Sequence, residues 1–100
     1  MNRPVRIHGI IWLPEIREKI VAKHAVRPVE VEQVLEGKPH VRRVSRGYRR
    51  GEDVYAALGR TAEGRLLIVF FIRKLMSDAL IISARDIDAK ERQRYAKIQG

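Results

Sequence analysis

The sequence predicts an α+β fold, in which helices pack against an antiparallel sheet of four to five strands. Three observations support this fold class. Apolar residues have helical spacing over residues 14–23, 28–36 and 88–97, the segment 40–84 breaks into short β-rich runs, and tight turns join these runs. Short turns imply antiparallel neighbours, and helices at both ends of the chain imply a layered fold with the order β-α-α-β-β-β-β-α.

The first half of the chain predicts one strand and two helices. Apolar and polar side chains largely alternate over residues 5–12, which is typical of a strand. Pro14 stands at the first position of a helix that we expect to reach about Lys23. Pro28 opens a second helix, and Gly37 ends it because glycine readily adopts the backbone conformation of a helix C-terminus.

The second half of the chain predicts four strands. Residues 40–49 form a polar strand, which we expect at the edge of the sheet, and residues 53–61 form the next strand. Residues 66–72 are continuously apolar, which is typical of a central strand that is covered on both faces. Residues 79–84 form the last strand, which is again apolar.

The C-terminal segment predicts a helix with a defined start. Asp88 is its expected N-cap, and Glu91 three residues later completes a capping box. Ile87, Glu91, Tyr95 and Ile98 share one face of this helix. The pattern suits a helix that lies on the sheet and also one that meets a partner, so the sequence leaves both arrangements open.

Composition limits the class of protein. A chain of 100 residues with 45% hydrophobic residues is expected to form a single domain over residues 1–100. Cysteine is absent, which excludes disulfides and favours a cytoplasmic location. No apolar run of about 18 residues occurs, so we expect no transmembrane helix. A membrane-surface role is also disfavoured, because the basic residues lie on a predicted strand.

The charge is strongly positive and unevenly distributed. Lysine and arginine total 21 against 12 acidic residues, and the net charge of +9 indicates an anionic partner. The segment Lys38–Arg50 contains six basic residues and no acidic one. One interpretation is a charged strand edge that prevents aggregation. The other is a surface that binds phosphate or an acidic partner, with Arg42, Arg43 and Arg46 as its substrate-binding residues.

The residue types favour chemistry without a metal or another cofactor. The three histidines, His8, His24 and His40, lack ligand spacing, and no glycine-rich phosphate loop occurs. Arginine, lysine, histidine and tyrosine remain, and this set suits RNA cleavage, in which the 2′-hydroxyl attacks its own phosphate. Trp12 and Tyr95 are candidates for stacking on RNA bases, and core packing is the alternative for both.

Four residues are candidates for the catalytic steps. Histidine titrates near neutral pH, so His24 is a candidate acid or base, although its place at the end of an apolar helix stripe equally suits packing or capping. Arg73 and Arg85 each follow an apolar strand, and we expect them side by side around a phosphate, or paired with nearby acids. Arg60 closes another strand and is expected to join them.

Short motifs follow one another along the chain. They are Trp12, Lys23-His24-Ala25-Val26, Gly51-Glu52, Gly59-Arg60, Gly64-Arg65-Leu66-Leu67, Ile81-Ile82-Ser83-Ala84-Arg85, Glu91-Arg92 and Tyr95. Their order and spacing resemble the BrnT family, the toxins of type II toxin–antitoxin pairs. The resemblance extends over nearly the whole chain, from about residue 10 to residue 95.

The resemblance implies a RelE-like ribonuclease fold and RNA cleavage without a metal. It also implies a BrnA-like antitoxin with a DNA-binding domain, which neutralises the toxin, represses the shared operon and joins the toxin in an oligomer. Lys23 is expected to orient phosphate beside the catalytic residues. The catalytic candidates that we carry over are His24, Arg60, Arg73, Arg85 and Tyr95.

Several positions depart from the family pattern. Leu13 replaces an acid, Ala25 replaces a glycine after the first helix, and Arg27 replaces a Ser or Thr cap of the second helix. Phe71 and Ile72 stand where a polar residue often precedes the strand-end arginine. This last change and the arginine-rich strand favour an alternative function, in which an inactive toxin scaffold binds a partner protein or nucleic acid through its basic face.

Overall fold

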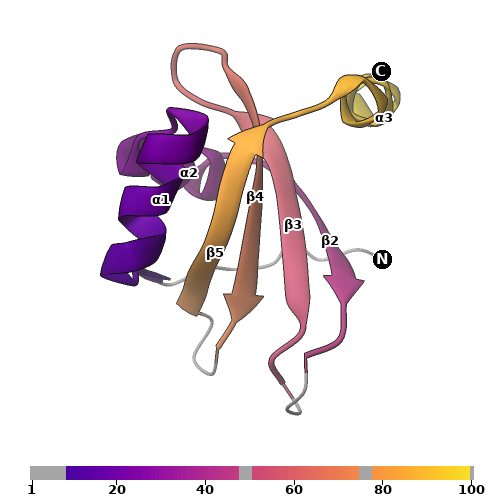
Figure 1. The fold of residues 1–100 in the computed structure, drawn as a ribbon. Helices are drawn as coiled ribbons and strands as arrows, with labels where there is room; N and C mark the ends of the chain where they lie inside the picture. The colour runs from indigo at the N-terminus through magenta and orange to yellow at the C-terminus, as the bar shows by residue number, and fades with distance from the viewer. Residues whose placement is uncertain (1–8, 48–50, 75–77, 100) are drawn as a thin grey trace.

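A five-stranded sheet lies between helices on both of its faces (Figure 1). The computed structural model describes residues 9–47, 51–74 and 78–99. Its elements in chain order are β1 (Gly9–Ile11), α1 (Pro14–His24), α2 (Pro28–Glu36), β2 (His40–Ser45), β3 (Val54–Arg60), β4 (Leu66–Arg73), β5 (Asp78–Asp86) and α3 (Ala89–Gln99). The predicted order of helices and strands is therefore confirmed.

The sheet is mixed, with the strand order β1-β5-β4-β3-β2. The strands β2 to β5 pair with one another in antiparallel fashion, as predicted. β1 instead pairs with β5 in parallel, with Gly9 opposite Asp78 and Ile11 opposite Leu80. The expectation of a wholly antiparallel sheet is therefore wrong at this edge. Parallel pairing is possible because a long connection, and no hairpin, joins the two strands.

Two of the predicted strands differ in length from the observed ones. β1 begins at Gly9, and the predicted strand positions 5–8 lie outside the described residues. β2 ends at Ser45, and its register shifts just before this residue. The predicted extension to residue 49 is therefore wrong at Arg46, which follows the strand, and positions 48 and 49 are not among the described residues. A bulge of this kind increases the local twist and ends strand pairing, which shortens an exposed sheet edge.

The larger core lies between the sheet and the helix pair α1 and α2 (Figure 1). Ile20 of α1 and Val34 of α2 pack in one cluster with Val69 and Phe71 of β4, and all four are at most 3% exposed. Ile68 of the same strand is equally buried but belongs to the cluster on the opposite face. β4 is thus covered on both faces, as its continuous apolar run predicts.

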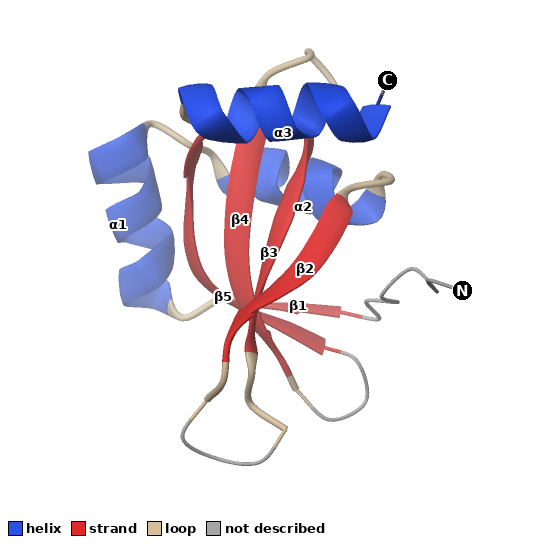
Figure 2. Cartoon of the chain, turned by 90° about the vertical axis from the view of Figure 1, so that its right-hand side faces the viewer, coloured by secondary structure: helices blue, strands red, loops and turns tan. Residues whose placement is uncertain are grey.

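α3 crosses the opposite face of the sheet near one end of the strands (Figure 2). Its Tyr95 packs in a cluster with Leu58 and Ile68. The predicted capping box is confirmed: the Asp88 carboxylate accepts a hydrogen bond from the Glu91 N–H, and the Glu91 carboxylate accepts one from the Asp88 N–H, both at 2.8 Å. Over the described ranges, no helix has the length and apolar character that crossing a membrane requires.

Arg65, just before β4, joins three elements at one corner of the fold. Its guanidinium donates hydrogen bonds to both carboxylate oxygens of Asp86 at the end of β5, at 2.8 and 3.0 Å. It also donates to Glu30 in the first turn of α2 at 3.2 Å, and to the carbonyls of His24 and Ala25 at the end of α1, at 3.2 and 2.9 Å. Because the last carbonyls of a helix lack partners within it, Arg65 satisfies them while it neutralises a buried carboxylate.

Ala25 ends α1 in the left-handed backbone conformation, with φ 50° and ψ 36°. The N–H of Ala25 donates to the carbonyl of Val21 at 3.0 Å, which is the 5→1 hydrogen bond of the αL motif, and the N–H of Val26 donates to the carbonyl of Ile20 at 3.4 Å. This position is one at which the sequence departs from the glycine of the BrnT pattern. A left-handed residue with a Cβ atom is strained, so the departure has an energetic cost.

We expect Ala25→Gly to raise the free energy of unfolding by about 0.5–1 kcal/mol, because relief of the left-handed strain exceeds the added entropy of the unfolded chain. Denaturant unfolding measures this change. The matched control is Ala22→Gly at an exposed position inside α1, which should lower the free energy of unfolding by about 1 kcal/mol. Equal losses in both variants would contradict the strain argument.

We expect Arg65→Lys to lower the free energy of unfolding by about 2 kcal/mol, because an ammonium cannot reproduce the forked contact with Asp86 and the bonds to α1 at once. Denaturant unfolding tests this loss against Arg17→Lys, which changes an exposed arginine of α1. A similar stability for both variants would show that the Arg65 contacts contribute little.

Candidate active site

The sheet face beneath α3 gathers several of the predicted site residues. Residues that pair directly across antiparallel strands point to the same face. One row across β2, β3, β4 and β5 contains His40, Leu58, Ile68 and Arg85. Arg60 lies further along β3, two residues after Leu58, and therefore points to this face as well. A histidine and two arginines from three strands thus share one surface.

A carboxylate holds Arg85 on this face. The guanidinium of Arg85 donates hydrogen bonds to both carboxylate oxygens of Glu91 at 2.8 and 2.9 Å, and it lies 5.7 Å from the centre of the Phe70 ring. The hydrogen bonds from Arg85 lower the pKa of Glu91 although burial opposes this shift, and the same pairing raises the pKa of Arg85. With 34% of its side chain exposed, Arg85 already binds an oxyanion in the forked geometry that a phosphate also accepts.

Arg60 and Tyr95 are in contact at the same end of the sheet. The guanidinium of Arg60 lies 5.9 Å from the centre of the Tyr95 ring and donates a hydrogen bond to the carbonyl of Gly64 at 3.1 Å. Tyr95 is only 6% exposed, and its ring packs in the apolar cluster beneath α3. Arg60 itself remains exposed. The buried tyrosine therefore supports a charged group that is accessible from solvent.

The two strand-end arginines lie at opposite ends of the sheet. Arg73 at the end of β4 pairs with Ala79 at the start of β5, whereas Arg85 at the end of β5 pairs with Ile68 near the start of β4. The expectation that they lie side by side is wrong, because consecutive antiparallel strands end at opposite edges. The strand rise puts about 17 Å between the backbone positions of Ile68 and Arg73.

The basic segment divides between the two faces of the sheet. Arg42 is exposed and pairs with Ala56, which belongs to the cluster beneath α3. Arg43, the next residue of the strand, points to the opposite face and donates a hydrogen bond to Asp53 at 3.2 Å. Arg46 is exposed and follows the end of β2. Strand pairing therefore places Arg42, and not Arg43, on the same face as Arg85.

Lys23 and His24 lie at the end of α1, on the other side of the sheet. The His24 carbonyl accepts a hydrogen bond from Arg65. Arg65 also donates hydrogen bonds to Asp86, and these are the chief cause of the lowered pKa of Asp86. The charge of His24 contributes to that pKa shift more weakly. Asp86 and Arg85 are neighbours in β5 and point to opposite faces. Lys23 and His24 are therefore not brought together with the face that carries Arg85.

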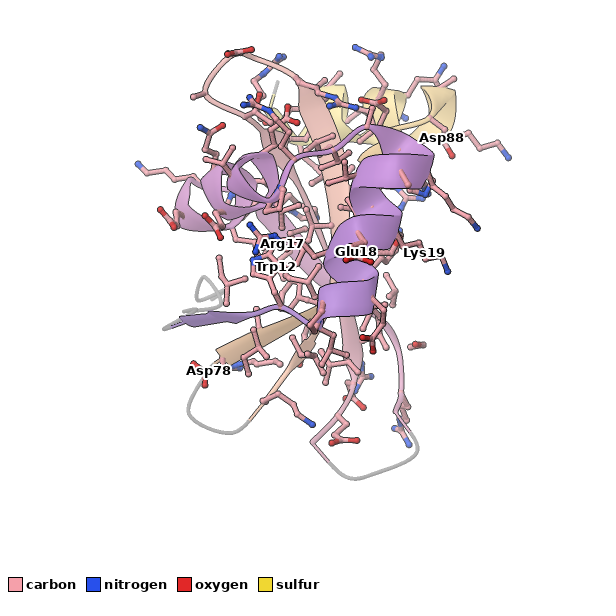
Figure 3. All side chains as sticks on the ribbon, turned by 60° about the vertical axis from the view of Figure 1, so that its left-hand side comes forward. Trp12, Arg17, Glu18, Lys19, Asp78 and Asp88 are labelled. Carbon is pink, nitrogen blue, oxygen red and sulfur yellow. The ribbon has the colours of Figure 1, made fainter. Side chains whose placement is uncertain are left out.

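Trp12 lines a separate groove. Its indole N–H donates a hydrogen bond to Glu32 of α2 at 3.2 Å. The groove has a volume of about 630 Å³ and is lined by Trp12, Pro14, Arg17, Glu18, Val21, Ala22 and Pro28. Figure 3 shows Trp12 beside Arg17 and well apart from Asp88, which caps α3. Trp12 therefore belongs to a different surface from Arg85.

Sequence reasoning does not single out two residues of the α3 face, His40 and Phe70. The alternation of side chains in β2 gives the signal for His40, because it places this residue on the same face as Arg42. The position of Phe70 beside Arg85 depends instead on the register of β4 against β5, which the sequence does not contain.

The ion pairs predict acid sensitivity. Asp86 and Glu91 have lowered pKa values in the folded state, so their contribution to stability is complete above the unfolded pKa of about 4 and is lost as the pH falls through the folded pKa. We expect the free energy of unfolding to decrease as the pH falls below about 5, and the Glu91→Gln variant to show a smaller decrease. Denaturant unfolding across this range measures both slopes, with Glu63→Gln, an exposed turn residue, as the charge-matched control. An unchanged slope in Glu91→Gln would contradict this account.

Comparison with known proteins places the chain in a family. A family model described as the ribonuclease toxin BrnT of type II toxin–antitoxin systems matches residues 12–91. Among solved structures, the Brucella abortus ribonuclease toxin BrnT has a similar fold, with a TM-score of 0.57 and 22% sequence identity, over 80% of this chain and 96% of that chain. No curated protein gives a significant sequence match. Because the family model matches most of its length, this chain belongs to the BrnT family of type II toxin–antitoxin toxins.

Proposed function

We propose that this chain is a cytoplasmic endoribonuclease with a RelE-like fold, and that it cleaves RNA on the sheet face beneath α3. Its family is described as a ribonuclease toxin. The observation that carries the proposal is the shared face of Arg60 and Arg85, with Tyr95 against Arg60 and His40 in the row of Arg85. These are the residue types that RNA cleavage through the 2′-hydroxyl requires.

Arg60 and Arg85 hold the scissile phosphate in this proposal. The 2′-oxygen of the RNA attacks the adjacent phosphorus and the bond to the 5′-oxygen breaks, which gives a 2′,3′-cyclic phosphate and a 5′-hydroxyl end. Negative charge increases on the phosphate oxygens during the attack, and the two guanidinium groups stabilise it. Arg85 exchanges the Glu91 carboxylate for the phosphate, since both offer two oxygens to the same fork.

His40 and Tyr95 are the proposed proton-transfer groups. A base must take the proton from the 2′-hydroxyl, and an acid must give one to the departing 5′-oxygen. His40 is partly buried on the same face, one strand away from the strand of Arg60, and the Tyr95 ring lies against Arg60. The other candidate, His24, lies on the far side of the sheet, so the geometry favours His40 and Tyr95.

The proposed reaction uses no metal, because the arginines provide the positive charge that a metal ion would otherwise supply. Membership in a type II toxin–antitoxin family implies an antitoxin partner. We propose that this partner is BrnA-like, that an acidic surface on it neutralises the toxin, and that the two proteins form an oligomer. The net charge of +9 supports an acidic partner surface.

A second candidate function is a binding module without catalysis. The ion pair between Arg85 and Glu91 favours it, because this pair already occupies the proposed phosphate-binding arginine. In that case the basic face beneath α3 binds a partner protein or nucleic acid and leaves RNA intact.

Cleavage of a fluorescently labelled single-stranded RNA by the full-length protein in EDTA tests the proposal. We expect Arg85→Ala and Arg60→Ala each to reduce the rate at least about 100-fold, because each removes a group that stabilises the transition state. Arg85→Lys keeps the charge without the fork and should retain part of the activity. Mass spectrometry should detect the cyclic phosphate end.

The matched control is Arg17→Ala, which removes an exposed arginine from α1 on the opposite side of the sheet. It should cleave at the wild-type rate, and thermal unfolding should show that all variants are folded. Wild-type cleavage by Arg85→Ala would contradict the proposed site. Loss of cleavage in EDTA with rescue by magnesium would contradict the metal-independent reaction, and RNA binding without cleavage would support the binding module.

A further inference from the structure

Phe70 lies at the margin of the apolar cluster beneath α3. It pairs with Ala56 on one side and with Ser83 on the other, and it packs against the buried residues of this cluster. The next residue of the strand, Phe71, is fully buried among the residues of the opposite core, whereas Phe70 remains partly exposed. An aromatic ring is thus accessible on the face that carries the candidate arginines.

The neighbours of Phe70 combine short side chains with positive charge. Ala56 and Ser83, which flank it in the row across the sheet, have short side chains. The guanidinium of Arg85 lies 5.7 Å from the ring centre, and Arg42 is exposed at the β2 end of the same row. The register of β4 and β5 shifts immediately after Phe70, and irregularities of this kind redirect the side chains beside functional sites.

We infer that Phe70 is a stacking platform for an unpaired base of single-stranded RNA. The inference deepens the proposed function and rests on it for the identity of the ligand. Aromatic rings on a basic protein surface bind single strands because every base has a π-face, while nearby cations hold the phosphates. Arg42 and Arg85 stand on either side of Phe70 across the sheet and supply those cations.

Arg85 couples the platform to the phosphate site. Its guanidinium lies by the Phe70 ring and binds the Glu91 carboxylate. A base that stacks on Phe70 replaces the Arg85 guanidinium on the ring. A phosphate replaces the Glu91 carboxylate as the partner of Arg85, so both exchanges move the Arg85 side chain. Bases in a duplex stack on one another and are paired, so their faces are closed to the ring. The platform therefore selects unpaired RNA.

The test uses the full-length protein and a short single-stranded 2′-O-methyl RNA that contains 2-aminopurine. This RNA cannot be cleaved through its 2′-oxygens, so binding is measured separately from catalysis. We expect Phe70→Leu to weaken binding about tenfold or more and to abolish the fluorescence quenching that stacking causes, whereas Phe70→Trp retains both. The matched control is Ile72→Leu on the same face of β4, which should bind as the wild type does.

A duplex of the same sequence separates stacking from charge. Phe70→Leu should bind the duplex as tightly as the wild type, because the phosphate contacts remain. Unchanged binding and quenching of the single strand in Phe70→Leu would overturn the inference, and so would an equal loss of single-strand and duplex binding. If the wild type stacks the base but cleaves no RNA, the platform stands and the ribonuclease proposal fails. If it cleaves RNA while Phe70→Leu binds normally, the ribonuclease stands and the platform fails.

Discussion

The charge cluster around Arg65 determines how the end of α1, the first turn of α2 and the end of β5 meet. Glu30 is only 7% exposed, and without Arg65 its buried charge would keep only the Arg27 backbone N–H at 3.0 Å and the Arg27 guanidinium at 3.7 Å, which is costly. The Arg65 guanidinium also fixes Asp86 at the end of β5 and thereby orients the strand. The adjacent residue, Arg85, points to the opposite face, beneath α3. The contact between Arg65 and Asp86 on the face of α1 and α2 therefore helps to position the candidate phosphate-binding arginine on the face of α3.

The period of two along each strand gives the faces of the sheet different roles. The face beneath α1 and α2 is closed by apolar side chains, and the charges at its rim are paired, as in Arg43 with Asp53. The face beneath α3 is closed only in part, and it leaves Arg42 and Arg60 exposed. Stability and the proposed chemistry therefore occupy opposite sides of the same strands, and neighbouring residues serve one or the other.

The order of elements could be predicted because each boundary has a local chemical cause. Pro14 and Pro28 begin helices, and the Asp88–Glu91 capping box begins α3. The candidate site could be predicted only in part, because Arg73 and Arg85 follow similar strands that end at opposite edges. The short turns predict antiparallel neighbours, from which the opposite ends follow, but local spacing contains neither the register of a strand nor the partner of a strand that a long connection separates from it. For the same reason the parallel pairing of β1 could not be foreseen.

The parallel pairing of β1 with β5 has a consequence for the folding pathway. The paired strands are about 70 residues apart in the chain, so closing their contact costs more loop-closure entropy than closing the hairpins between β2 and β5. The hairpins from β2 to β5 are local and can form first. On the ribosome, β1 leaves the exit tunnel long before β5 does, and it remains unpaired until β5 has emerged. The face with Arg85 is assembled only once α3 has emerged, so a nascent chain cannot acquire the proposed activity before the residues of α3 are made.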